Sequence, residues 1–389
     1  MDRSTPRPHV GAQDEPATSP PELPRVSVVM PVRNEAHFIA RSLGAVLAQD
    51  YPADRVEVLL VDGCSEDETL AVARSLPGAE RVRVLVNPAR VQAAGMNLAL
   101  RQARGDIVVR ADGHTVLAPD YLRQCVATLR RASAANAGGR MDASTDPMTV
   151  SPTGLAVALA TRSRFGVPTA FHTSVLAQET DTVYLGAWPR KVLEQVGGFD
   201  ERLRANEDYE LNYRIRRAGG RIYLNPAIRS TYFPRQSLSA LARQYLGYGQ
   251  GKARMLAKHP ASVQPRQLVA PAFVAAGVLG ALLWRIPPVR ALWLATLAAY
   301  ASLNAAASLR LIRASATHAT GTRVPWTVRG RLPLVFLTIH LAWGVGFWMG
   351  LLAVVIRWIR REAGQSARAP DVGRVQTPRP VQMGSEGRG

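Results

Sequence analysis

The sequence predicts an α/β domain followed by a C-terminal helical membrane region. Strand-like and helix-like segments alternate over residues 26–131, which is typical of an α/β sheet domain. Three long apolar runs follow in the last third of the 389-residue chain. The positive charge is concentrated there too, because residues 236–389 hold 19 Lys and Arg against 3 Asp and Glu, whereas residues 1–235 hold 29 against 26.

The chain begins with a polar, proline-rich segment, residues 1–24, which has no apolar core and is expected to be disordered. It does not resemble a secretory signal. We therefore expect the globular part to stay in the cytoplasm.

The α/β pattern starts at residue 26. The β-rich runs VSVVMP, VEVLLVD, VRVLV and DIVVRAD alternate with helical spacing over Glu35–Ala48, Glu68–Leu76 and Val91–Ala103. Strands separated by helices form parallel sheets with helices on both faces, and fully apolar strands fit burial on both sides. In such sheets the ligand lies beyond the carboxyl ends of the strands.

Polar segments follow three of these runs. They are Pro31-Val-Arg-Asn-Glu35, Asp62-Gly-Cys-Ser-Glu-Asp67 and Asp112-Gly-His114. Each alone would serve as an ordinary turn. Together on one edge, their carboxylates would bind the base and ribose of a nucleotide, and an Asp with a nearby His would hold a divalent cation against its diphosphate. No GxGxxG or GxxxxGK[ST] follows the first run, so neither a dinucleotide fold nor a P-loop is indicated.

The apolar runs are Leu268–Trp284, Ala291–Leu309 and Leu332–Ile356. Each is close to the roughly 20 residues that cross a bilayer, and arginines gather at their ends. The alternative is a set of buried helices in a soluble domain, for which the third run is too long. The first run is either a short span or a re-entrant segment. Since the basic excess accompanies these runs, it predicts contact with membrane lipids and no nucleic-acid partner.

Five arginines between the second and third runs indicate a cytoplasmic loop. Three spans would then place the basic tail outside, which the positive-inside rule disfavours. The number of spans stays open. We predict a multi-pass protein of the plasma membrane with the α/β domain in the cytoplasm.

Four segments carry a family resemblance: VSVVMPVRNEAHFIARSLGAVLAQDYP, VDGCSEDET, AGMNLALRQARGDIVVRADGH and GGFDERLRANEDYELNYRIRRAGGRIY. Over about residues 25–255 the chain resembles the family 2 glycosyltransferases, inverting enzymes of the Rossmann-like GT-A fold, in particular the succinoglycan-biosynthesis glucosyltransferase branch. The resemblance implies a nucleotide-sugar donor, with a UDP-hexose as the family-level expectation, and a divalent cation, Mn²⁺ or Mg²⁺. It also implies a polyprenyl-linked or glycan acceptor in exopolysaccharide or cell-envelope biosynthesis.

The resemblance implies roles for the strand-end residues. The family's first acidic residue falls on Glu35, beside Pro31 and Arg33, and its second falls on Asp62, so these are predicted nucleotide contacts. The metal-binding Asp-x-Asp falls on Asp112-Gly-His114, where His replaces the second carboxylate. Mn²⁺ would tolerate this imidazole better than Mg²⁺.

The segment Asn206-Glu-Asp-Tyr-Glu210 matches the family's Glu-Asp motif. Asn206 is a good N-cap, and Leu211 and Ile215 would face the core, which places Glu207 and Asp208 in the first turn of a helix. Acids there would also merely suit the helix dipole. With the rest of the motif set, the resemblance makes Asp208 the general base, with Glu207 beside it.

Four later residues match the family's donor-closing helix only locally: Arg235, Arg243, Gln244 and Tyr248. The typical Gln-x-x-Arg-Trp spelling is missing. The alternative is a basic interfacial helix touching lipid headgroups. His340, inside the third run, either contacts the acceptor or, as we prefer, packs between helices as a hydrogen-bonded neutral side chain.

The predicted organisation therefore has five parts: a disordered segment 1–24, a glycosyltransferase domain 25–235, an amphipathic interfacial segment 236–262, about three transmembrane helices over 263–361, and a disordered basic tail 362–389. A catalytically silent relative serving as a membrane scaffold is the alternative. A silent relative should have lost some of the acidic residues of the candidate site, and all of them are present here.

Overall fold

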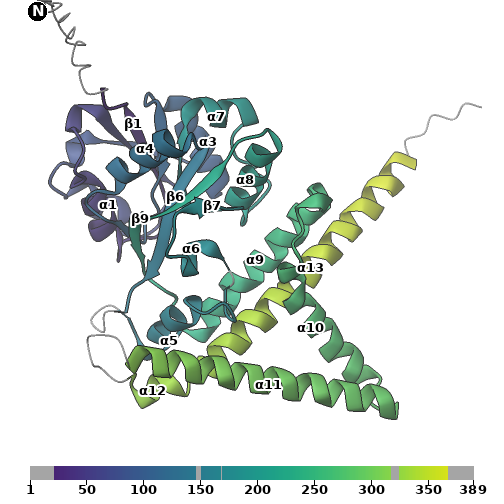
Figure 1. The fold of residues 1–389 in the computed structure, drawn as a ribbon. Coiled ribbons are helices and arrows are strands. Elements are labelled where there is room, and N and C mark those ends of the chain that lie inside the picture. Colours follow the sequence, from purple (N-terminus) through teal and green to yellow (C-terminus); the bar gives the residue numbers. More distant parts are fainter. Residues whose placement is uncertain (1–21, 146–149, 168, 317–323, 367–389) are drawn as a thin grey trace, which may run out of the picture.

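The computed structural model describes residues 22–145, 150–167, 169–316 and 324–366. Residues 1–21 and 367–389, where the sequence predicts disordered segments, lie outside this description. An α/β part and a helical part with long diverging helices are connected through α9 (Leu238–Lys258) (Figure 1).

The predicted parallel sheet is present in the first half of the α/β part. Strand β1 (Val26–Val32) lies between β2 (Val56–Asp62) and β4 (Ile107–Arg110), and β3 (Val82–Val86) lies beyond β2. All three pairings are parallel. Since β1, β2 and β4 run the same way, their carboxyl ends lie at one edge.

Helices cover both faces of this sheet, as predicted. On one face Val28 and Met30 of β1 pack in a core with α1 and α4, and on the other Val29 packs in a core with α3, α7 and α8. Leu211 and Ile215 of α8 are buried in the second core, so their predicted orientation is confirmed. The helices are α1 (Ile39–Leu47), α2 (Thr69–Arg74), α3 (Gln92–Gln102), α4 (Tyr121–Ala132), α7 (Arg190–Val196) and α8 (Glu207–Arg217).

The second half of the sheet is mixed. Its strands are β5 (Thr115–Leu117), β6 (Asn136–Ala143), β7 (Gln178–Glu179), β8 (Tyr184–Pro189) and β9 (Ile222–Tyr232). The order is β3-β2-β1-β4-β8-β6-β9-β5, with β7 on β9. β8 joins β4 in antiparallel fashion, and β5 pairs with the end of β9, where Thr115 lies opposite Tyr232. This pairing places the end of β9, at Tyr232, beside the segment that follows His114.

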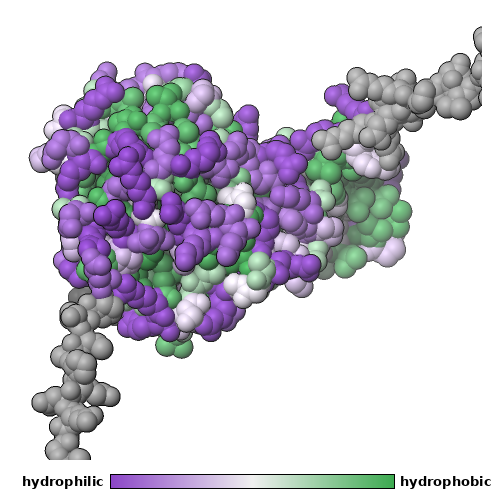
Figure 2. All heavy atoms as spheres, turned by 90° about the horizontal axis from the view of Figure 1, so that it is seen from above, coloured by the Kyte–Doolittle hydropathy of each residue, from purple (hydrophilic) through white to green (hydrophobic). Residues whose placement is uncertain are grey.

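Three helices among the described residues are long and apolar enough to cross a membrane. They are α10 (Pro265–Leu282), α11 (Pro287–Ala316) and α13 (Leu332–Ser366), the last with the short α12 (Trp326–Arg329) ahead of it. Each contains most of one predicted apolar run. In Figure 2 hydrophilic residues cover much of the α/β part. Hydrophobic residues gather at the end of the helical part that points away from it, on the right of the view.

One short helix of the α/β segment belongs to the helical packing. Helix α5 (Pro152–Thr161) buries Ala156 and Ala160 in a core with Leu241 of α9 and Phe336 of α13. The chain therefore enters the helical part twice, first at α5 and again at α9. Helix α6 (Ala170–Thr173) follows α5 and returns the chain to the sheet.

Helices α9 and α13 approach each other through glycines. A Cβ on Gly350 would lie 2.8 Å from the Cα of Gln250, and one on Gly346 would overlap the backbone of Leu246. Small residues at such positions allow close helix contact. Because Leu246 faces Gly346 and Gln250 faces Gly350, the two helices run in the same direction.

His340 of α13 lies between helices. Its Nε2 is 2.8 Å from the carbonyl oxygen of Phe165, and its Nδ1 is 3.0 Å from the hydroxyl of Tyr300. In the neutral imidazole, Nε2 would donate to the carbonyl and Nδ1 would accept from the Tyr300 hydroxyl. The preferred interhelical role is confirmed.

Candidate active site

The loops after β1 and β2 are fastened to each other. Asn34 adopts a left-handed conformation with φ of 55°, its N–H donates to Ser65 Oγ at 3.0 Å, and its Oδ1 accepts from the N–H of Glu66 at 2.9 Å. The Asp62 carboxylate is buried and accepts from the N–H of Ser65 at 3.2 Å. Asp62 thus shapes this turn, and it lies where the sequence places a nucleotide contact.

The loop after β4 brings Glu35 and His114 together. Glu35 Oε1 lies 2.9 Å from His114 Nδ1. Gly113 makes this contact possible, since a Cβ there would lie 2.8 Å from Glu35 Cγ. A carboxylate on Nδ1 fixes the imidazole tautomer and leaves the Nε2 lone pair for another partner.

Asp112 is held by Arg110, the last residue of β4. Its Oδ1 accepts from Arg110 Nε at 2.8 Å and from Gln92 Nε2 at 3.2 Å, and its Oδ2 accepts from Arg110 NH2 at 3.2 Å. Burial alone would raise the pKa of Asp112, but the charge and hydrogen bonds of Arg110 outweigh it and hold the pKa below its usual value. Within the described part of the chain, Oδ2 accepts from Arg110 alone, which leaves it a second lone-pair site.

Arg110 also reaches the acidic pair of α8. Its NH1 lies 3.2 Å from Glu207 Oε1, and the guanidinium is nearly inaccessible to solvent. Burial, followed by the charge of Asp208, raises the pKa of Glu207 to about 7, although Arg110 opposes this shift. One buried arginine therefore links the predicted metal ligand Asp112 with the two predicted catalytic acids, Glu207 and Asp208.

Asn206 occupies the N-cap position of α8 but does not cap the helix with its side chain. Its backbone is left-handed, with φ of 63°, and its Nδ2 donates to the carbonyl oxygen of Tyr248 at 2.9 Å. The expected capping bond is therefore wrong. The left-handed backbone directs the side chain to α9, so Asn206 attaches the start of α8, which carries Glu207 and Asp208, to this helix.

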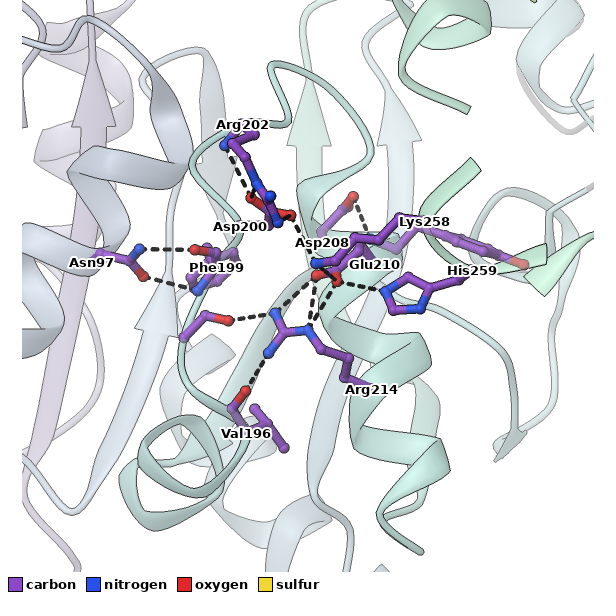
Figure 3. Close-up of polar contacts among 12 residues, drawn as sticks. Asn97, Val196, Phe199, Asp200, Arg202, Asp208, Glu210, Arg214, Lys258 and His259 are labelled. Carbon is purple, nitrogen blue, oxygen red and sulfur yellow. Dashed lines mark hydrogen bonds and ion pairs between the residues drawn. The ribbon is translucent and has the colours of Figure 1, made fainter. Parts of the chain in front are cut away.

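The next turn of α8 is held by basic side chains (Figure 3). The fully buried Glu210 accepts hydrogen bonds from Arg214 at 2.8 Å, Lys258 at 2.6 Å and His259 at 2.9 Å. Lys258 also pairs with Asp200 at 2.7 Å. The last residues of α9 and its C-cap are thereby joined to the helix that presents Asp208.

The α9 residues predicted to contact the donor divide into two groups. Gln244 Nε2 donates to the hydroxyls of Tyr248 at 2.9 Å and Tyr232 at 3.3 Å, and the Tyr232 ring packs edge-on against His114. The positive charge of Arg235 acts on Tyr232 and Tyr248, so Arg235 lies near this group. Arg243 is exposed on a different face of α9.

Arg33 and Pro31 lie at the rim of the strand edge. Pro31 is half-buried in β1, and Arg33 is exposed, with its NH2 4.0 Å from Glu66. Sequence reasoning missed Arg110 and Gln92. The signal for Arg110 was a charged residue inside the apolar run DIVVRAD, which a buried strand tolerates only with a partner.

The edge has the donor types that a divalent cation requires. Among the described residues, no three His, Cys, Asp or Glu side chains converge as a ready-made metal site. Asp112 and His114 nevertheless offer one carboxylate oxygen and one imidazole nitrogen, and Asp112, Glu207 and Asp208 share a single arginine. Two protein ligands plus diphosphate oxygens is a usual arrangement for such ions, so the residues fit.

Residues 24–247 match the family model described as "Glycosyltransferase like family 2". The chain belongs to glycosyltransferase family 2. It is 31% identical to the succinoglycan biosynthesis protein ExoA of Rhizobium meliloti over 334 residues, which is 84% of this chain and 94% of that protein. Family 2 glycosyltransferases are typically inverting, so the predicted enzyme class is confirmed.

Two further comparisons extend this family assignment. A dolichyl N-acetyl-α-D-glucosaminyl phosphate 3-β-D-2,3-diacetamido-2,3-dideoxy-β-D-glucuronosyltransferase of Methanococcus voltae is 27% identical over 60% of this chain and 74% of its own length. The mannosyltransferase PcManGT of Pyrobaculum calidifontis, solved with GDP-Man and Mn²⁺, superposes with a TM-score of 0.52 and 24% identity over 83% of this chain and 88% of that one. The latter similarity concerns the fold and confirms the predicted GT-A architecture.

Proposed function

We propose that this glycosyltransferase is membrane-bound and transfers a sugar from a nucleotide-sugar donor, a UDP-hexose, to a lipid-linked or glycan acceptor in exopolysaccharide or cell-envelope biosynthesis. The observation that carries the proposal is the convergence of Asp112 and the Glu207–Asp208 pair on Arg110 at the carboxyl edge of the sheet. A donor diphosphate at Asp112 and an acceptor hydroxyl at Asp208 would then lie side by side.

The reaction is a single displacement at the anomeric carbon. Asp208 removes the proton of the acceptor hydroxyl, the new oxygen–carbon bond forms, and the bond to the diphosphate breaks on the opposite face. A divalent cation held by Asp112 and His114 would supply the positive charge that the leaving diphosphate requires. Glu35 orients His114, and Arg110 holds both Asp112 and Glu207 in place.

The relatives support the substrate classes. The Rhizobium relative is named for succinoglycan biosynthesis, and the Methanococcus relative for a dolichyl-phosphate-linked acceptor. The fold neighbour holds GDP-Man with Mn²⁺. A single addition to a polyprenyl-diphosphate-linked acceptor agrees with three candidate spans, which are few for an export channel.

The donor and the cation can be tested together. Purified full-length protein is offered a panel of nucleotide sugars, donor hydrolysis is measured, and UDP is titrated by calorimetry with Mn²⁺ or with EDTA. We expect UDP-hexose turnover and tighter UDP binding with Mn²⁺, a difference that Asp112→Ala removes. No hydrolysis of any donor would favour the silent scaffold, and equal UDP affinity in EDTA would contradict the cation site.

The orientation can be tested on the full chain. A reporter enzyme that is active only outside the cytoplasm, fused to the N-terminus, should give no signal if the α/β part faces the cytoplasm. The same reporter at the C-terminus distinguishes an odd from an even number of spans. Activity at the N-terminus would reverse the proposed topology.

A further inference from the structure

Three arginines from separate parts of the chain gather beside the base-bearing turn. Arg204 belongs to the loop that leads into α8, Arg254 belongs to α9, and Arg357 belongs to α13. The residues next to Arg204 pack directly on α9, because a Cβ on Gly251 would lie 2.6 Å from the Ala205 carbonyl oxygen. Arg204 is therefore beside the turn of α9 that contains Arg254.

The register of α9 and α13 brings the third arginine to the same level. Leu246 faces Gly346 and Gln250 faces Gly350, so Arg254 is level with residue 354 of α13. Arg357 lies about one turn further on, but its Nε donates to the Ala353 carbonyl oxygen at 3.1 Å, which turns the side chain back toward this level.

The cluster lacks a counter-charge. No carboxylate of the described residues lies within 4.0 Å of Arg204, Arg254 or Arg357, and the Nε of Arg254 is buried with no hydrogen-bond partner. Partial burial lowers the pKa of Arg254, and the positive charges of Arg357 and Arg204 lower it further. Such an arrangement of like charges costs free energy unless an anion occupies it.

The surroundings specify the kind of anion. Arg357 is the first charged residue after the apolar run Leu332–Ile356, and the preceding turns of α13 expose Leu352, Val355 and Ile356, an apolar surface that suits a lipid chain. Guanidinium groups match phosphate oxygens with paired hydrogen bonds. Arg204 precedes Asp208 by four residues, a span of at most about 14 Å, which is within reach of a short glycan.

We propose that Arg204, Arg254 and Arg357 form the binding site for the diphosphate of a lipid-linked acceptor, so that the attached sugar extends to Asp208. The inference rests on the proposed function, and it adds the residues that would select a phosphate-bearing lipid. The lipid chain would follow α13 into the membrane, and the glycan would point into the active edge.

The test uses the full-length protein in nanodiscs of zwitterionic lipid, with a long-chain polyprenyl diphosphate as one probe and UDP as the other. We expect Arg204→Gln and Arg254→Gln each to weaken binding of the polyprenyl diphosphate roughly tenfold, as the loss of a hydrogen bond to a charged group does. UDP affinity should stay as in the wild type. Arg204 is exposed, whereas Arg254 is half-buried, so the Arg204 variant tests the site at a position where a loss of folding is not expected.

The matched control is Arg285→Gln, which removes the same charge at the exposed turn between α10 and α11 and should bind both probes as the wild type does. Equal polyprenyl diphosphate affinity in the wild type and both cluster variants would overturn the proposal. An equal loss of binding to phosphatidylglycerol nanodiscs that lack the probe would also overturn it, because the cluster would then be a general headgroup site. Absence of UDP binding by the wild type would contradict the proposed function instead, and the lipid measurement would still decide the arginine site.

Discussion

Two glutamates one turn apart on α8 have opposite electrostatic environments. Both Glu207 and Glu210 are buried, with 4% and 0% of their surface exposed. Burial and Asp208 raise the pKa of Glu207 to about 7, since among the described residues its cationic contact is Arg110 alone, which it shares with Asp112. Burial would also raise the pKa of Glu210, but hydrogen bonds from Arg214, Lys258 and His259 outweigh burial and lower it.

The difference shows how one helix serves two purposes. At Glu210 the cations match or exceed the acids, and the result is a rigid junction between α8 and α9. At Glu207 the acids exceed the cations, which leaves a site that attracts a divalent ion or a proton. The excess of carboxylates around Glu207 coincides with the candidate active site. The charge-balanced cluster around Glu210 holds the helix that carries this site in place.

The largest expected effect comes from Asp208. Asp208→Asn keeps the shape and removes the basicity, so transfer should fall by about 10²- to 10⁴-fold while UDP binding survives. Single-turnover transfer from a labelled nucleotide sugar to a lipid acceptor, measured beside UDP affinity, checks this. Transfer at near the wild-type rate would make Glu207 the candidate base, and loss of UDP binding would assign Asp208 to the donor or the fold.

Removing the charge of Glu210 should cost stability more than chemistry. Glu210→Gln leaves Arg214 and Lys258 without their buried carboxylate, and we expect the free energy of unfolding to fall by about 3 kcal/mol. Thermal unfolding in detergent measures this. Glu194→Gln, which breaks the exposed pair with Arg190, is the matched control and should change stability by less than about 0.5 kcal/mol. An equal change in stability in both variants would mean that the Glu210 contacts do not stabilise the protein more than an exposed ion pair does.

The pH dependence should separate the two glutamates. A pKa raised in the folded state favours folding fully below the unfolded value of 4.5, and this contribution is lost as the pH rises through about 7. The wild type should therefore lose stability relative to Glu207→Gln between pH 5 and pH 7.5. Asp200 and Glu210, whose pKa values are lowered, lose their contribution as the pH falls. A constant difference in melting temperature between wild type and Glu207→Gln would show that Glu207 is ionised throughout.

The smallest effect is expected at Gly113. In Gly113→Ala the new Cβ would meet Glu35 Cγ at 2.8 Å, so Glu35 must leave His114. We expect the Mn²⁺-dependent gain in UDP affinity to shrink a few-fold and stability to fall by about 1 kcal/mol. Gly44→Ala, in α1 with no atom within 4 Å of its Cβ, should be neutral or slightly stabilising. Calorimetric titration of UDP into both variants, with and without Mn²⁺, decides whether the Glu35–His114 contact contributes to cation-dependent UDP binding.

The parallel half of the fold could be predicted from the sequence because each strand is a continuous apolar run with a helix after it. The mixed half could not, since its pairings depend on long-range closure, as when β5 joins β9 across more than a hundred residues. Similarly, the strand-end acids were visible as motifs. Their partners were less visible, because Gln92 reaches Asp112 from another element, α3, and because Arg110, only two residues before Asp112, is revealed as a site residue by its distant contact with Glu207. Asn206 shows the limit of local rules, since its capping propensity gives way to a tertiary contact with Tyr248.

Helix α5 has a practical consequence for anyone who wishes to dissect this enzyme. A truncation after Arg235 would remove α9 and α13, and Leu159, Ala160 and their neighbours on α5 would lose the apolar partners that cover them. The excised catalytic domain would expose the apolar face of α5 to solvent, and aggregation should follow even if the sheet folds correctly. Solubility would have to be restored by redesigning α5 itself, since no choice of end point separates the catalytic machinery from its membrane part.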